Sequence, residues 1–266
     1  MTTLYQYGAA GTPSEYREFF KFPAISLDEM RSWIKDGAGD DAIGLGAVVN
    51  AKGEIVGELV MPGGKDAYMV DKAGNAMPVP ADHKITFAQI GCMAPEIRAE
   101  LDVTSKDDLQ AKLAALLPEG KRDAYMVRVT GALPNVEFRT VDTQGKTIDT
   151  LPGLLSKETS FTKTYTDDKN YQLVGLYSKK DAVESGVTFD DVLHLHGLDQ
   201  EHHQGGHLNN FSGNTHVTVE LMPITEWLTA TREAAQAQGQ EAIPASISWA
   251  DRMAKRSEAS ADRSLG

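Results

Sequence analysis

Histidine is concentrated in one segment of the chain. Five of the seven histidines lie within positions 194–207, in the sequence HLHGLDQEHHQGGH. Residues two apart in a β-strand share a face, so His194 and His196 should project together, with Leu193 and Leu195 on the opposite side. The polar loop and glycine pair that follow favour a turn, after which the chain returns as an antiparallel partner. The segment therefore predicts a β-hairpin.

The returning strand would carry a third histidine into the same place. It brings His207 opposite His196, and directly paired residues have Cβ atoms about 5 Å apart. Three imidazoles with an open fourth position are the ligand set of a catalytic zinc centre, whereas structural zinc sites are usually closed by four protein ligands. We therefore predict that His194, His196 and His207 bind a metal ion. His202 and His203 are adjacent residues of a polar loop, and we expect them to face solvent.

Composition narrows the other possibilities. The 266 residues carry a formal net charge of −12, which argues against nucleic acid as a partner because phosphate binding depends on clustered lysine and arginine. Cys92 is the single cysteine, which excludes an internal disulfide and a cysteine-based zinc site. No window approaches the ~18 consecutive apolar residues of a membrane span, and the start of the sequence lacks a basic leader with an apolar core. We expect a cytoplasmic protein without a membrane partner.

Strand signals dominate the pattern of predicted elements. Helices are predicted over 26–37 and 105–117, each opening on a serine N-cap with an acidic residue three positions later. β-rich runs separated by turn residues predict strands over 43–70 and a hairpin over 124–141 that turns at GALPN. YQLVGLYS and HVTVELMPI predict further strands, and after Pro223 the pattern becomes helical. A chain of this length can form one large domain or two packed ones.

The histidine segment and several other motifs are similar to those of one enzyme family. The spacing of HxH, ten residues and then H, with the third histidine in GGH, resembles the zinc-binding segment of alpha-acetolactate decarboxylase. Further segments that resemble this family are TLYQYG, IGLGAV, GELVMPGGKDAYMV, AYMVRVTGALPNVEFRTV and VELMP. The resemblance covers most of the chain.

The resemblance implies a fold and an assembly. The fold would be mixed α/β of the α+β type, predominantly β, with two intimately packed domains built on mixed and antiparallel sheets. Residues 1–120 would form an N-terminal mixed β-sheet domain with helices. Residues 121–266 would form a C-terminal β domain that carries the three-histidine metal site and a helical or extended tail. The metal site would lie at the domain junction, and the protein would be a homodimer through its N-terminal sheet.

The resemblance also implies roles for further side chains. Arg139 matches an arginine in the family's TRTV strand, with Phe138 here in place of the preceding threonine. A glutamate of the N-terminal hairpin matches Glu58 by its GELV surroundings and Glu54 by its distance from GLG; Glu58 is favoured and Glu54 stays open. Glu258, in RSEAS, matches a glutamate near the C-terminus.

The implied activity is that of a zinc-dependent carboxy-lyase. The three histidines would hold Zn2+, which would polarise the ketone of acetolactate. Arg139 would bind the carboxylate or the developing negative charge, and the glutamates would supply a proton. The products would be acetoin and carbon dioxide, on the pathway to butanediol. Two alternatives stay open, because Ala47 stands where the family has a threonine. One is a non-catalytic zinc-binding or sensing module, and the other is a three-histidine zinc lyase for another small 2-hydroxy-3-oxo acid.

Overall fold

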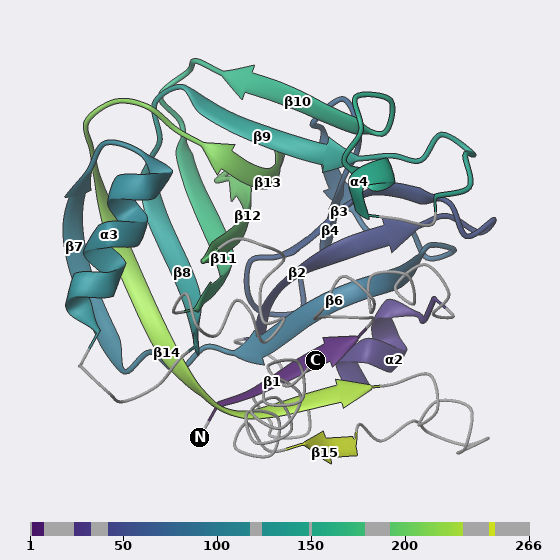
Figure 1. Ribbon diagram of the computed structural model, residues 1–266, viewed down its shortest axis with the longest axis horizontal. Coiled ribbons are helices and arrows are strands. Elements are labelled where there is room, and N and C mark those ends of the chain that lie inside the picture. Colours follow the sequence, from purple (N-terminus) through teal and green to yellow (C-terminus); the bar gives the residue numbers. More distant parts are fainter. Residues whose placement is uncertain are drawn as a thin grey trace, which may run out of the picture.

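The computed structural model describes most of this 266-residue chain. The described residues are 2–7, 24–32, 42–117, 124–148, 151–178, 192–230 and 245–247. They are predominantly β, with short helices beside the strands (Figure 1). The helices are α2 (Leu27–Ser32), α3 (Lys106–Leu116) and α4 (Leu151–Leu154).

The strands form two sheets that share one long strand, β14 (Thr215–Ala230). The N-terminal sheet has the order β14-β1-β6-β2-β3-β4-β5, and β15 also pairs with β14. Its other strands are β1 (Thr2–Tyr7), β2 (Ala42–Val49), β3 (Ile55–Met61), β4 (Tyr68–Val70), β5 (Ala76–Pro78), β6 (Lys84–Cys92) and β15 (Ala245–Ile247).

The C-terminal sheet has the order β10-β9-β13-β12-β11-β8-β14, and β7 also pairs with β14. Its other strands are β7 (Ile97–Val103), β8 (Ala124–Ala132), β9 (Val136–Val141), β10 (Ser160–Tyr165), β11 (Asn170–Ser178), β12 (Leu193–Asp199) and β13 (Gly205–Asn210). Among the described strands, only β1 and β14 pair in parallel; the other pairings are antiparallel. The predominantly β fold with mixed and antiparallel sheets is therefore confirmed.

The predicted hairpin over 124–141 is wrong in its pairing. Both strands form, but β8 pairs with β11 and β14, whereas β9 pairs with β13 and β10. The strands β11, β12 and β13 lie between them in the sheet. Partners far along the chain bury Val129 and Phe138 in the core of this sheet, and a local turn signal carries no information about such partners.

The predicted helix after Pro223 is wrong as far as Ala230. Strand β14 continues to that residue, with Leu4 of β1 opposite Trp227 in parallel register and β15 on its other side. Backbone hydrogen bonds to neighbours on both sides outweigh a weak helical preference. The rest of the predicted helical segment lies outside the described residues.

The predicted serine caps are confirmed where the structure describes them. Ser105 accepts a hydrogen bond from the Asp108 amide at 3.1 Å, and Asp108 in turn accepts one from the Thr104 amide at 2.9 Å. The first bond satisfies an amide of the first helical turn, and the second satisfies the amide of Thr104, which precedes the N-cap. Leu109 and Leu113 then face the core one turn apart. Within the described part of the chain, no helix is long and apolar enough to cross a membrane.

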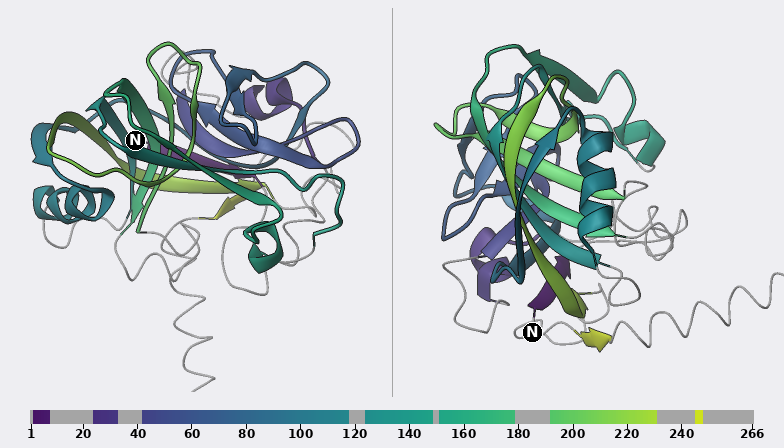
Figure 2. Two further views of the ribbon diagram at one scale, coloured as in Figure 1. Left: turned by 90° about the horizontal axis from the view of Figure 1, so that it is seen from above. Right: turned by 90° about the vertical axis from the view of Figure 1, so that its left-hand side faces the viewer.

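The C-terminal sheet is covered on both faces. Helix α3 packs on one face, where Leu109 and Leu113 join Val127 and Val219 in an apolar core (Figure 2). Residues of the opposite parity face the N-terminal sheet, and a second apolar cluster joins the two sheets there. Its members include Val60, Val70, Met126, Val174, Leu176 and Leu198. The histidine strand β12 therefore has one face inside the C-terminal core and the other against the N-terminal sheet.

Candidate metal centre

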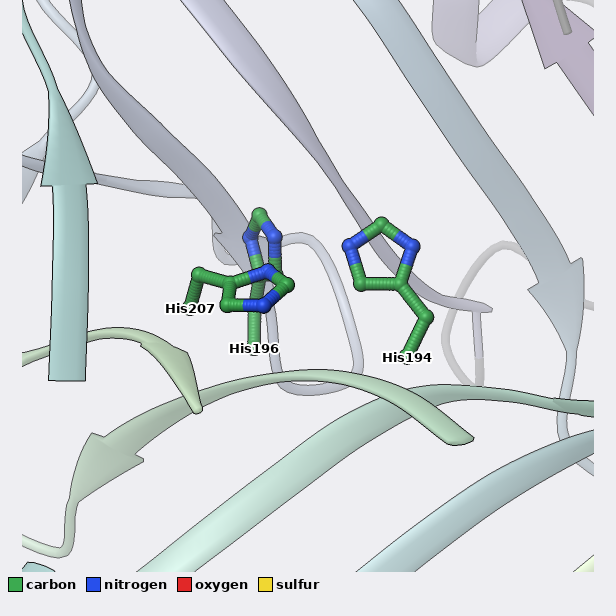
Figure 3. Close-up of side chains that lie close together, drawn as sticks. All are labelled: His194, His196 and His207. Atoms are coloured by element: carbon green, nitrogen blue, oxygen red, sulfur yellow. The ribbon is translucent and has the colours of Figure 1, made fainter. Parts of the chain in front are cut away.

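The three predicted histidines converge on the face of the C-terminal sheet that meets the N-terminal sheet. His196 and His207 are directly paired across β12 and β13, as the sequence predicts. The ring centroids of His194, His196 and His207 lie 4.9 to 5.3 Å apart, and one nitrogen from each ring lies within 4.8 Å of the others. Figure 3 shows the rings gathered above the strands that carry them. Such a group could hold a metal ion.

Burial keeps these imidazoles neutral. All three side chains are buried, with at most 7% of the residue exposed. Desolvation lowers the pKa of His196 to about 3 and holds the pKa of His194 and His207 well below the usual value. Neutral imidazole is the protonation state that binds metals. The protein therefore presents three ring nitrogens without first having to remove protons.

One contact from the N-terminal sheet fixes the tautomer of His196. Its Nδ1 lies 2.9 Å from the carbonyl oxygen of Leu59 in β3. Because a carbonyl oxygen only accepts, Nδ1 carries the proton and donates it, which leaves Nε2 with its lone pair. An outer partner of this kind orients a ligand ring before any ion arrives.

Glu58 of β3 is the carboxylate that the structure brings to the histidines. Its Oε2 lies 3.8 Å from His196 Nε2, and the residue is 5% exposed. Burial raises the pKa of Glu58 to about 8, although the charge of Arg139 lowers it in part. In the metal-free protein this carboxyl group is therefore largely protonated at neutral pH, and an acid in that state can donate a proton.

Glu54, the alternative glutamate, lies in a turn before β3 and contacts Asn50. It precedes β3, in a turn where Asn50 Nδ2 donates to Glu54 Oε2 at 2.7 Å and the Glu54 amide donates to Asn50 Oδ1 at 3.1 Å. The two glutamates share strand parity by counting, but the pairing of β2 with β3 shifts register next to Ile55. Such a bulge ends the alternation of faces. The structure therefore separates Glu54 from the histidines.

Arg139 reaches the same face from β9. It is paired directly with His207 across β9 and β13, so the two side chains project together. Its charge acts on Glu58 and on the three histidines. Within the described part of the chain, its buried Nε has no hydrogen-bond partner. An unsatisfied buried donor is costly, and an anionic group of a bound molecule would satisfy it.

Sequence comparison relates this chain to one family of known proteins. The model of the alpha-acetolactate decarboxylase family matches residues 35–239. The chain belongs to this family. It is 26% identical over 187 residues to the alpha-acetolactate decarboxylase of Brevibacillus brevis, which is 70% of this chain and 61% of that protein. The chain thus spans less than two thirds of the length of this curated relative.

Solved structures show the same fold. The alpha-acetolactate decarboxylase of Bacillus subtilis strain 168 superposes with a TM-score of 0.65 at 21% identity, covering 85% of this chain and 88% of that one. A Staphylococcus aureus protein described as of unknown function and similar to alpha-acetolactate decarboxylase gives 0.70 at 18% identity, covering 97% and 99%. Family membership, predicted from the motifs, is therefore confirmed.

An apolar wall borders the acidic side of the site. Ala47 of β2 is directly paired with Glu58 on one side and with Phe87 of β6 on the other. These two apolar residues belong to a buried cluster with Leu45, Val141 and Leu154. The low polarity of this wall accounts for the raised pKa of Glu58, because burial disfavours the charged form.

Sequence reasoning missed Lys106. This buried residue begins α3 and donates from Nζ to the carbonyl oxygen of Leu208 at 3.1 Å, and its charge acts on all three histidines. No signal marks it, because a lysine in a first helical turn is usually solvated. Glu258, the remaining predicted site residue, lies outside the described residues.

Proposed function

We propose that this protein decarboxylates 2-acetolactate to acetoin and carbon dioxide with the help of a divalent metal ion, Zn2+. The observation that carries the proposal is the convergence of His194, His196, His207, Glu58 and Arg139 on one buried face in a member of this family. No other small molecule needs to supply an electron sink if a cation stabilises the developing negative charge.

The residues present fit such an ion. Three neutral imidazole nitrogens lie close enough to share one ion, and an oxygen of Glu58 lies 3.8 Å from one of the rings. An all-nitrogen set with a nearby carboxylate suits zinc and other first-row divalent ions. A bound ion would supply Lewis-acid polarisation of substrate oxygens. His194, His196 and His207 would hold this ion.

Arg139 would orient the substrate by its carboxylate. The planar guanidinium stays charged and makes paired hydrogen bonds to carboxylates, and its buried Nε has no other partner in the described structure. When the bond between the carboxylate carbon and the hydroxyl-bearing carbon breaks, carbon dioxide leaves. The electron pair of that bond then moves towards the former ketone, which produces an enediolate.

Glu58 would donate the proton that converts the enediolate into acetoin. In the metal-free protein, burial raises the pKa of this carboxyl group to about 8, so that it can carry the proton that it would donate to the carbon that lost carbon dioxide. One proton from solvent then restores Glu58, so the overall reaction consumes one proton for each acetolactate anion. Because Glu58 approaches from the N-terminal sheet alone, protonation on one face would give a single enantiomer.

Further parts of the proposal rest on the family resemblance. Glu258 would contribute a second carboxylate. Residues 1–120 and 121–266 would act as two packed domains with the metal site at their junction, and two copies would associate through the N-terminal sheet. The enzyme would act in the cytoplasm on acetolactate, in acetoin and butanediol formation.

The experiment is acetoin formation from racemic acetolactate by purified protein of known zinc content. We expect turnover by the wild type, a loss of about 10²–10⁴-fold for Glu58→Gln, and activity within about twofold of wild type for Glu54→Gln. The two glutamates differ in their distance from the histidines, so they form a matched pair. Bound zinc without acetoin would refute the proposed reaction. Turnover of a different 2-hydroxy-3-oxo acid would then identify an altered substrate, and no turnover at all would identify a binding module.

A further inference from the structure

A turn of the N-terminal sheet docks onto the loop that precedes His207. This docking turn, residues 71–76, runs from the end of β4 to the first residue of β5. The histidine loop, residues 199–206, runs from the last residue of β12 to the second residue of β13. The Ala76 amide donates to the His203 carbonyl oxygen at 3.0 Å, and the Gly205 amide donates to the Gly74 carbonyl oxygen at 3.3 Å. A bridge between Asn75 and Gln204 lies between these two bonds. The histidine hairpin therefore has a backbone partner from outside its own sheet.

Strand β10 holds the same turn from a third direction. The Tyr165 hydroxyl donates to the Gly74 carbonyl oxygen at 3.0 Å, and Lys163 Nζ donates to the Ala73 carbonyl oxygen at 2.9 Å. Burial raises the pKa of Tyr165 to about 12, so the hydroxyl keeps its proton. The Gly74 carbonyl thus accepts from both Tyr165 and Gly205, which links β10 to the start of β13.

Position 74 accepts only glycine. Its φ is +78°, which side-chain-bearing residues rarely adopt. A Cβ there would also lie 2.1 Å from the Tyr165 hydroxyl oxygen. The close approach of backbone and hydroxyl is therefore built into the chain at this point.

Each side of the contact has its own aspartate. Asp71 Oδ1 accepts from the amides of Ala73 and Asn75 at 2.8 and 2.9 Å, which folds the docking turn. Asp199 is buried, and its Oδ1 accepts from the amides of His203 and Gln204 at 2.6 and 3.1 Å, which folds the histidine loop. Two preformed turns therefore meet, so little chain entropy is lost when they dock.

The docking turn connects the two halves of the site. Val70 ends β4 and is directly paired with Glu58 in β3, and the next residue opens the docking turn. At its other end the turn contacts Gly205, two residues before His207. We propose that the docking turn positions the histidine hairpin relative to Glu58, with Gly74 and Tyr165 as positioning residues. This inference rests on the proposed function only in giving the histidines the role of metal ligands.

The first test needs no metal. Amide hydrogen exchange across residues 199–208 would be compared in metal-free wild type, Tyr165→Phe and Tyr177→Phe. Tyr177 is equally buried in the same core and makes none of the docking contacts, so it is the matched control. We expect exchange of the Gly205 amide to be about three- to tenfold faster in Tyr165→Phe alone, because this variant loses the hydrogen bond from Tyr165 to the docking turn. Equal exchange in all three proteins would overturn the inference.

A second pair of variants keeps the test independent of the buried tyrosine. Asp71→Ala removes the acceptor that folds the docking turn, whereas Asp71→Asn keeps it. We expect Asp71→Ala to bind Co2+ about three- to tenfold more weakly and to shift its visible absorption bands, and Asp71→Asn to match the wild type. Identical Co2+ affinity and spectra for both variants would contradict the positioning role. An inactive wild type whose Gly205 protection still depends on Tyr165 would refute the proposed reaction while supporting the docking turn.

Discussion

Arginine and glutamate side chains meet at both ends of a row of directly paired residues in the C-terminal sheet, but the contacts between them differ. Directly paired residues run across the C-terminal sheet on a single face. From β7 to β9 this row consists of Arg98, Glu220, Arg128, Val174, His196, His207 and Arg139. At the near end, Glu220 receives hydrogen bonds from Arg98 and Arg128, with Arg128 Nε at 2.6 Å. At the far end, Arg139 acts on Glu58 through its charge, and the described structure shows no ion pair between them.

The pKa values of the two glutamates diverge accordingly. Burial raises the pKa of Glu220, but the hydrogen bonds and charges of Arg128 and Arg98 outweigh it and lower the pKa below its usual value. For Glu58 burial dominates and raises the pKa to about 8. Direct pairing makes a carboxylate a structural anion, while burial without direct pairing leaves an acid that can exchange its proton. Contact geometry, and not residue type, separates the structural end of the row, at Glu220, from the proposed chemical end, beside Glu58.

The largest expected effect on metal binding and activity comes from replacing His196. His196→Ala removes a buried imidazole of the candidate metal set and should lower metal content to background and acetoin formation by at least about 10³-fold. His216→Ala, at an exposed position of β14, should leave both within about twofold. Metal analysis and the acetoin assay on the two variants provide the measurement. A His196→Ala protein that keeps its metal would place the ion elsewhere.

The two arginine positions should respond differently to the same change. Arg139→Lys keeps the charge but loses the planar pair of donors, so kcat/KM should fall by about 10–10²-fold. Arg128→Lys makes that substitution at the structural end and should leave kcat/KM within about threefold. Steady-state kinetics on both proteins test this. Equal losses in the two variants would show that the ends of the row are not distinct.

The free energy of unfolding should depend more on Glu220 than on Glu58, which is the opposite of the order expected for activity. Glu220→Gln leaves two arginines without their anion and should lower the free energy of unfolding by about 1–3 kcal/mol at pH 7. In metal-free protein, Glu58→Gln should cause no loss, because a neutral amide replaces a carboxyl group whose ionised form burial disfavours. Urea unfolding of the metal-free variants measures both values. A larger loss for Glu58→Gln would contradict the assignment of structural and chemical ends.

The contribution of Glu220 should also depend on pH with a definite sign. Because its pKa in the folded protein is lowered from 4.5, the stabilisation is present above the unfolded-state pKa and is lost as the pH falls through the folded-state value. The stability difference between wild type and Glu220→Gln should therefore shrink below pH 4.5. Unfolding curves from pH 3 to 7 would show this, and a difference that stays constant would refute it.

The smallest effect concerns an exposed histidine. His216 contacts Asp102 at 2.8 Å and Glu100 at 3.1 Å, and these partners raise its pKa above 6.5. Its stabilising contribution is present below pH 6.5 and is lost as the pH rises through the folded-state pKa. An NMR titration should show His216 gaining its proton above pH 6.5, unlike the three buried rings. A midpoint below 6.5 would contradict the role of the two carboxylates.

Local patterns in the sequence determined much of this protein. Alternation placed His194 and His196 on one face, the polar residues after them predicted the turn that sets His207 opposite His196, and the serine cap predicted the start of α3. The glycine pair expected in that turn lies in β13 instead. Motif similarity predicted the family. These features depend on residues close together in the chain, and short-range sterics and hydrogen bonding determine them.

The tertiary structure decided what local patterns leave open. It inserted three strands between β8 and β9, extended β14 through a segment with helical pattern, and brought Glu58 to 3.8 Å from His196. The hydrogen bond from His196 Nδ1 to the carbonyl oxygen of Leu59 joins residues that are 137 positions apart in the sequence. The docking turn likewise joins segments of the two sheets that are distant in the sequence. Such partners are selected by how whole sheets pack and bury their apolar faces, a cooperative choice that no short stretch of sequence encodes.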